Sequence, residues 1–103
     1  MSLSRADLAD FAYFIAIAKH RSFRKAATEM GVSSSALSHA MTALEERRGV
    51  RLLNRTTRSV TLTAAGEELQ AGIAGSLDAI SGASERLDRY RDEPAGRIRN
   101  DAL

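Results

Sequence analysis

Apolar residues between residues 4 and 19 recur at steps of three and four, which is the spacing of one face of an amphipathic helix. The apolar positions on this face are Leu8, Phe11, Phe14 or Ile15, and Ala18. Ser4 can accept the hydrogen bond that begins such a helix, and Asp7 suits its positive N-terminal end. We therefore predict a helix over residues 4–19.

Two shorter helices are predicted on either side of Gly31. Ser22 can cap the first and Ser33 the second, which should run to about Arg48 and end at Gly49 because glycine readily follows a helix. Their inward positions are Phe23, Ala26, Ala27 and Met30 in the first helix, and Leu37, Met41 and Leu44 in the second. Two short helices around a tight turn are typical of helix-turn-helix DNA-binding units, so the second is the candidate recognition helix.

The following segment predicts a small β hairpin, or wing. Val50, Leu52 and Leu53 should return to the core, residues 54–59 form a polar turn, and a short β-like segment ends at residues 60–62. Thr63 can cap a fourth helix, which meets no strong breaker before Pro94. This helix would hold about 28 residues and measure ~42 Å at ~1.5 Å per residue.

The fourth helix carries an apolar stripe that resembles a coiled-coil seam. Its positions are Leu69, Ile73, Leu77, Ile80, Ala83 and Leu87. A strict heptad from Ile73 would include Ser84 instead of Ala83, so we expect the packing to loosen there. A small head cannot cover so long a stripe, and each large aliphatic side chain left in water would forfeit up to roughly 1.5–3 kcal/mol. The seam therefore predicts a partner helix.

Together these elements predict a mainly α fold: a winged helix-turn-helix with a small β wing, followed by a long linker helix that dimerises. The expected organisation is a DNA-binding domain over residues 1–62 and a dimerisation helix over residues 63–92. That this helix is a linker, and that residues 93–103 start a hinge, is what the family resemblance given below implies. The chain has 103 residues, of which 44% are hydrophobic, enough for one small core with an appendage.

Composition narrows the function classes. The chain has no cysteine and two histidines, too few ligands for a zinc site, and we expect no metal and no cofactor. The absence of cysteine also fits a reducing, cytoplasmic setting. The longest apolar run is less than half the ~20 residues of a membrane span, so we expect a soluble protein without membrane contact. Residues 1–62 hold ten basic and five acidic side chains, whereas residues 63–93 hold three basic and seven acidic ones. A basic head with an acidic tail suits phosphate binding by the head, although scattered solvated charges give the same count.

Recognition helices contact base edges mainly from their N-terminal turns. The solvent-facing candidates here are Ser34, Ser35, Ser38, His39 and Thr42. A blander interpretation makes Ser33 to Ser35 a capping segment only. Ser38 and His39 are poorly placed for a catalytic pair, since adjacent helix residues diverge by ~100° and no third group orients them.

Two arginines, Arg55 and Arg58, flank the tip of the predicted wing. A cationic side chain there can enter a minor groove or pair with a phosphate. The alternative is an ordinary solvated loop charge.

With this pattern in place, the chain resembles the N-terminal region of LysR-type transcriptional regulators over roughly residues 6–99. The resembling segments are Leu8 and Phe11, Ser22-Phe23 with Ala26-Ala27, Val32-Ser33 with Ala36-Leu37-Ser38, Leu44-Glu45, Gly49, Leu52 to Arg58, and Leu62 to Gly66. By resemblance, Ser34, Ser35, Ser38 and His39 match positions that contact DNA, and Arg58 is the minor-groove candidate. Arg48 stands where the family usually has an apolar residue. Arg21 stands where the family usually has a glycine, so we expect a different backbone conformation at that turn.

The resemblance also implies partners. Linker helices of the family pair antiparallel, the full-length assembly is often a tetramer, and a small-molecule effector binds a sensing domain that this chain lacks. Residues 94–99 look like the junction to that domain, so the resemblance implies a truncated fragment. The leading hypothesis is a sequence-specific, dimeric DNA-binding module that recognises an inverted repeat. The alternative is a winged-helix protein-interaction module without DNA affinity, and an enzyme is set aside because no catalytic constellation is present.

Overall fold

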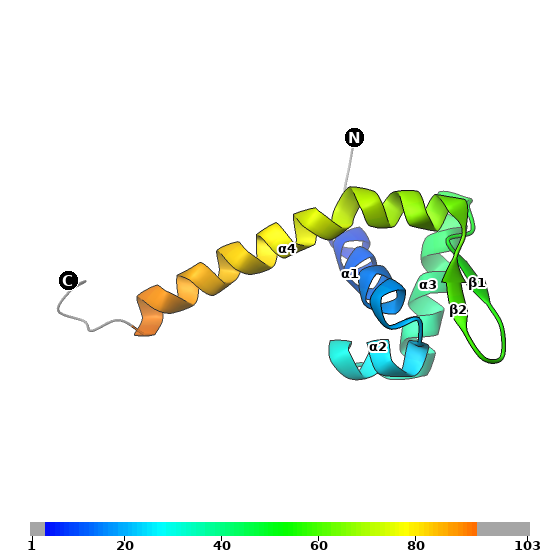
Figure 1. The fold of residues 1–103 in the computed structure, drawn as a ribbon, viewed down its shortest axis with the longest axis horizontal. Coiled ribbons are helices and arrows are strands. Elements are labelled where there is room, and N and C mark those ends of the chain that lie inside the picture. The colour runs from blue at the N-terminus through cyan, green and yellow to red at the C-terminus, as the bar shows by residue number, and fades with distance from the viewer. Residues whose placement is uncertain (1–3, 93–103) are drawn as a thin grey trace.

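The computed structural model describes residues 4–92, which form a helical head and one long projecting helix (Figure 1). In chain order the elements are α1 (Arg5–His20), α2 (Phe23–Met30), α3 (Ser34–Arg48), β1 (Leu53–Arg55), β2 (Val60–Leu62) and α4 (Ala64–Asp92). This order confirms the predicted winged helix-turn-helix with a long final helix. The division into functional units at residue 62 stays a prediction, and the predicted hinge at residues 93–103 lies outside the described residues.

Serine hydroxyls begin the first three helices, as predicted. Ser4, Ser22 and Ser33 each accept a hydrogen bond from the backbone N–H three positions later, at 3.0–3.1 Å. Ser4 also donates its own N–H to the Asp7 carboxylate, which completes a capping box. Gly31 (φ 72°) ends α2 and Gly49 (φ 69°) ends α3 in the left-handed conformation that glycine accommodates without strain.

Arg21 ends α1 in the same left-handed conformation, with φ 52° and ψ 33°. Our expectation of a different backbone there was wrong: the turn keeps the geometry that suits glycine, and an arginine occupies it. Its backbone N–H donates to the Ile17 carbonyl and its Nε donates to the Ala18 carbonyl at 3.1 Å. These two bonds tie the strained residue to the helix that it ends.

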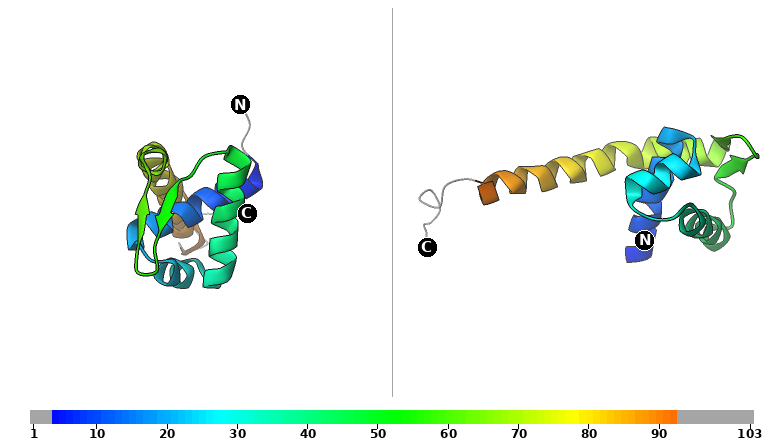
Figure 2. Two further views of the ribbon diagram at one scale, coloured as in Figure 1. Left: turned by 90° about the vertical axis from the view of Figure 1, so that its right-hand side faces the viewer. Right: turned by 90° about the horizontal axis from the view of Figure 1, so that it is seen from below.

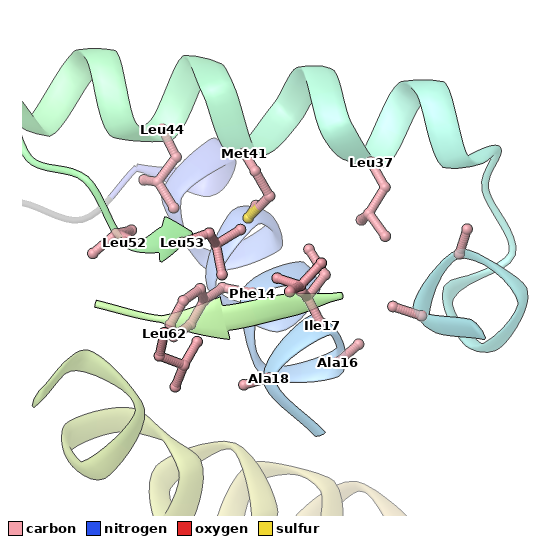
Figure 3. Packing of buried hydrophobic residues seen from close by; sticks show 13 residues of the cluster. Phe14, Ala16, Ile17, Ala18, Leu37, Met41, Leu44, Leu52, Leu53 and Leu62 are labelled. Atoms are coloured by element: carbon pink, nitrogen blue, oxygen red, sulfur yellow. The ribbon is translucent and has the colours of Figure 1, made fainter. Parts of the chain in front are cut away.

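The core lies between α1, α3 and the hairpin (Figure 3). Leu37, Met41 and Leu44 of α3 point toward Phe14 and Ile17 of α1, and all five side chains are buried, as predicted for α3. Ala26 and Ala27 of α2 and Leu52, Leu53, Val60 and Leu62 from the hairpin complete the buried set.

Two residues predicted to be inward are exposed instead: Leu8 is 48% exposed and Val50 is 42% exposed. On α1 the inward stripe runs through Asp7 and Asp10 to Phe14 and continues at Ile17, so Leu8 falls off it. Val50 follows the end of α3 and lines an open apolar groove that continues onto α4. Both errors arose from assuming that an apolar residue at the right spacing is buried.

The wing is a two-stranded antiparallel hairpin with the pairs Leu53–Leu62, Asn54–Thr61 and Arg55–Val60. Alternation places Leu53 and Leu62 against the core and leaves their strand neighbours in solvent. Thr56 closes the loop, because its N–H donates to the Ser59 carbonyl at 2.9 Å and its hydroxyl accepts the Ser59 N–H at 3.0 Å. The predicted hairpin is therefore confirmed.

The long helix α4 starts on the head and then leaves it (Figure 2). Thr63 caps it as predicted: its hydroxyl accepts the Gly66 N–H at 3.0 Å and donates to the Arg51 carbonyl at 2.7 Å. Leu69 and Ile73 pack against the core of the head, whereas Ile80 and Leu87 are 60% and 68% exposed. The predicted seam is thus divided, since its first part is used within the chain and its outer part faces solvent. No helix within residues 4–92 is long and apolar enough to cross a membrane.

Candidate nucleic-acid interface

The N-terminal turns of α3 present a polar surface beside the wing. Ser34, Ser35, His39 and Thr42 are exposed, and Ser38 is half-buried. Ser33 is occupied as the cap, because its hydroxyl accepts the Ala36 N–H at 3.0 Å. The capping interpretation therefore applies to Ser33, and the hydroxyls of its two successors have no hydrogen-bond partner among residues 4–92.

Ser38 and Thr42 lie one turn apart on α3 and share one partner, Arg55 of β1. The Arg55 guanidinium donates to Ser38 Oγ at 2.7 Å and to Thr42 Oγ1 at 3.4 Å. It also stands 4.7 Å from the centre of the Phe23 ring. The structure thus joins three predicted site residues, with Arg55 directed toward α3 and α2.

Arg58 occupies the loop of the wing and is exposed. Its backbone N–H donates to Thr56 Oγ1 at 3.2 Å, which fixes the loop beneath it. The guanidinium has no ion pair or hydrogen bond within the described part of the chain. The two wing arginines therefore differ: the Arg58 charge is available to a ligand, whereas that of Arg55 is engaged.

Two further arginines, at the end of α3, are also engaged. Arg47 donates to Asp7 and Asp10 at 2.9 Å each, and these carboxylates raise the pKa of its guanidinium. The Arg48 guanidinium lies 3.4 Å from the Asp7 carboxylate and 6.0 Å from the centre of the Phe11 ring. Its charged end therefore forms a salt bridge beside an aromatic face. The ten basic side chains counted in residues 1–62 therefore overstate the charge that is free to meet phosphates.

Comparison with known proteins decides what this arrangement is. The family model "Bacterial regulatory helix-turn-helix protein, lysR family" matches residues 8–67, which is more than half of the chain. The chain belongs to the LysR family. It is 43% identical over 98 residues to the uncharacterized HTH-type transcriptional regulator YcaN of Escherichia coli strain K12, covering 95% of this chain and 32% of YcaN. It is also 41% identical over 97 residues to the regulator PgrR of the same strain, covering 94% of this chain and 32% of PgrR.

Solved structures agree with this assignment. A complex of BenM_DBD with catB site 1 DNA has a TM-score of 0.71 at 28% identity, covering 84% of this chain and 97% of that one. Corynebacterium glutamicum OxyR in its oxidized form has a TM-score of 0.73 at 37% identity, covering 84% of this chain and 28% of that one. The LysR-family chain spans about a third of the length of YcaN and PgrR. These relatives are named as transcriptional regulators, a class of proteins that are not enzymes.

Two ties between elements of this LysR-family head were missed by sequence reasoning. The first is formed by the buried carboxylates of Asp7 and Asp10 with the more exposed Arg47, and it joins α1 to the end of α3. The Ser4 backbone N–H and the Arg47 guanidinium hold the pKa of Asp7 below its usual range. One available signal was that the two aspartates continue the spacing of Phe14 and the core face of α1.

The second tie is Glu45, whose carboxylate accepts the backbone N–H groups of Leu52 and Leu53 at 2.8 and 3.0 Å. It fixes the start of the wing to α3. Elsewhere on the head, His20 Nε2 lies 2.6 Å from Glu29 Oε1. The hydrogen bond to His20, together with the charge of nearby Lys19, lowers the pKa of Glu29. The Glu45 contact orients the wing, whereas the contact between His20 and Glu29 joins α1 to α2.

Proposed function

We propose that this chain is the DNA-reading part of a LysR-type regulator and that two copies bind an inverted-repeat operator in the bacterial cytoplasm. The observation that carries the proposal is the unpartnered polar face at the start of α3, on a head of the LysR fold whose wing carries the free charge of Arg58. The likeness to BenM_DBD in its complex with catB site 1 DNA supports the same conclusion.

In this proposal the N-terminal turns of α3 enter the major groove. Ser34, Ser35 and His39 face the base edges, and Ser38 and Thr42 lie about one and two turns after Ser34 on the same side of the helix. Because most of these side chains are short, each reads few atoms, and sequence preference depends on an accurately held helix. Arg58 enters a minor groove or meets a phosphate at the wing, which is the contact that its free guanidinium allows.

Dimerisation is proposed through α4. The outer seam holds Ile80, Ala83 and Leu87 in solvent, and a ~43 Å helix of 29 residues cannot keep such a stripe uncovered at no cost. Pairing with α4 of a second copy, antiparallel as the family resemblance implies, would bury it together with Leu77 and the parts of Leu69 and Ile73 that the head leaves exposed. A tetramer of the full-length protein and a small-molecule effector bound by another part of it complete the proposal.

The test is fluorescence anisotropy with two labelled 40-base-pair duplexes, one enriched by the protein from a random pool and one with that sequence shuffled. We expect tighter binding to the enriched duplex at matched salt, and an affinity that falls steeply as salt rises. Arg58→Ala should weaken binding to both duplexes and lower the slope of log K against log salt by about one. Arg89→Ala on the distal part of α4 is the matched control and should change neither quantity.

The proposal fails if the folded, dimeric protein binds neither duplex at low salt. That result would favour the alternative of a winged-helix module that interacts with proteins. Equal affinity for the two duplexes would remove sequence reading from this chain while leaving DNA binding in place.

A further inference from the structure

We infer that Arg55 is a positioning residue for DNA reading, which acts by holding the Ser38 and Thr42 hydroxyls as hydrogen-bond donors toward bases. This inference rests on the proposed function and assigns Arg55 a role different from the phosphate contact predicted from its place in the wing. It makes the specificity of α3 depend on a residue of β1.

The geometry is that of a fork across one helical turn. Ser38 and Thr42 are four residues apart on α3 and therefore lie on one side of the helix, at the spacing that two guanidinium nitrogens can bridge. One terminal nitrogen of Arg55 lies 2.7 Å from Ser38 Oγ, and the other lies 3.4 Å from Thr42 Oγ1. The donor is charged in both contacts, and the shorter contact, to Ser38, is the stronger of the two.

The charge of Arg55 is already matched inside the protein. Its guanidinium lies 3.9 Å from Glu45 Oε1 and 4.7 Å from the centre of the Phe23 ring, and its side chain is only 30% exposed. A move outward to a phosphate would separate it from the carboxylate, the aromatic face and both hydroxyls at once. By contrast, Arg58 has none of these partners within residues 4–92, so an approach to phosphate costs it no internal contact.

The consequence for Ser38 is a fixed hydrogen-bonding role. A serine hydroxyl has one donor and two acceptor sites, and the Arg55 N–H occupies an acceptor site. Its O–H has no acceptor within the described residues and remains available to a ligand. Ser38 is therefore prepared to meet acceptor atoms, which in the major groove are purine N7, guanine O6 and thymine O4.

The same contacts hold the wing against α3. Arg55 is the last residue of β1, and the Glu45 carboxylate accepts the backbone N–H groups of Leu52, just before the strand, and Leu53, its first residue. The wing loop that carries Arg58 follows directly. Arg55 thus also sets the separation between the groove read by α3 and the groove reached by the wing.

The experiment measures anisotropy with the enriched and shuffled duplexes over a salt series, for Arg55→Ala, Arg55→Lys, Ser38→Ala and the double variant Arg55→Ala with Ser38→Ala. Arg58→Ala serves as the control for a phosphate contact. We expect Arg55→Ala to leave the salt slope on the shuffled duplex unchanged and to reduce the preference for the enriched duplex about fivefold, the size of one lost hydrogen bond. Ser38→Ala should cause a similar loss, and the double variant should add little to either.

Lysine keeps the charge of Arg55 but has no planar fork, so Arg55→Lys should lose the preference as well. The inference is overturned if Arg55→Ala lowers the salt slope as Arg58→Ala does, if lysine restores the preference, or if the losses from Arg55 and Ser38 multiply to about twenty-fivefold. Thermal unfolding is recorded for every variant, and Arg55→Lys with Ser38→Ala completes the cycle if Arg55→Ala does not fold. If the unmodified protein binds neither duplex, the proposed function itself fails, which is a different result from any of these.

Discussion

Replacing Glu45 by alanine should cost more stability than any other single change to an acidic residue of α3. The substitution removes the acceptor of two backbone N–H groups, those of Leu52 and Leu53, which lie in a buried part of the chain. A buried donor left without a partner costs about 1–3 kcal/mol, so two donors, with some relief from entering water, give about 2–4 kcal/mol. The Arg55 guanidinium also loses its nearest carboxylate.

Glu46→Ala is the matched control. Glu46 is the next residue, carries the same charge, is exposed, and makes no hydrogen bond or ion pair among residues 4–92. Its removal should change the free energy of unfolding by less than about 0.5 kcal/mol. Glu45→Gln keeps a side-chain acceptor oxygen without the charge and should fall between the two.

The assay is thermal and urea unfolding followed by circular dichroism, at one protein concentration because pairing would stabilise the folded state. For a domain of this size 1 kcal/mol corresponds to a shift of roughly 4–8 °C, so a loss of about 2–4 kcal/mol should make Glu45→Ala unfold about 8–32 °C earlier. Equal midpoints for Glu45→Ala and Glu46→Ala would refute the argument that this carboxylate holds the wing.

Three further changes test other parts of the structure. Gly66→Ala places a Cβ against the Leu52 backbone carbonyl and should lower the free energy of unfolding by about 1–3 kcal/mol. Gly75→Ala, in open space, should raise it by up to about 1 kcal/mol, and equal urea midpoints for the two variants would contradict this. Asp7 has a lowered pKa in the folded state, so its stabilisation is present at neutral pH and is lost as pH falls below about 3.9. Asp7→Asn should therefore flatten the acid limb of the stability curve, and parallel curves would count against the ion pair. Ile80→Asp should convert a dimer to a monomer in sedimentation analysis while Ser81→Asp does not, and a monomeric unmodified chain would remove the premise.

Local signals accounted for most of the fold. The ends of α1, α2 and α3 are set by a hydroxyl at one side and a left-handed residue at the other, and both signals act within a few residues of the end that they mark. The inward face of α3 followed from spacing alone, because Leu37 and Met41 have no competing polar neighbour on that side. Local sequence is sufficient where one residue both marks an element and completes its hydrogen bonds.

The errors concern contacts between residues far apart in sequence. Spacing placed Leu8 in the core, but Arg47, about forty positions away, allows Asp7 and Asp10 to occupy that side of α1. Their position in the hairpin predicted the same groove or phosphate contact for Arg55 and Arg58. The hydrogen bond from Arg55 to Ser38 of α3 shows that the two arginines have different surroundings. The predicted DNA contacts themselves stay predictions, since they depend on a partner as well as on the chain.

The division among the arginines bears on why a long helix should accompany so small a head. In the proposed complex, a head that reads bases with serines and has one unengaged arginine in its wing should bind with modest affinity as a single unit. Joining two heads through α4 makes the second contact intramolecular, at an effective concentration that reaches the millimolar range for well-matched linkers, so affinity rises without new charge. That gain is lost if the two heads turn independently, and Leu69 and Ile73 oppose such turning because they pack the base of α4 onto the head. In the proposed dimer, the inner positions of the seam would orient the head, and the outer positions would join it to the second head.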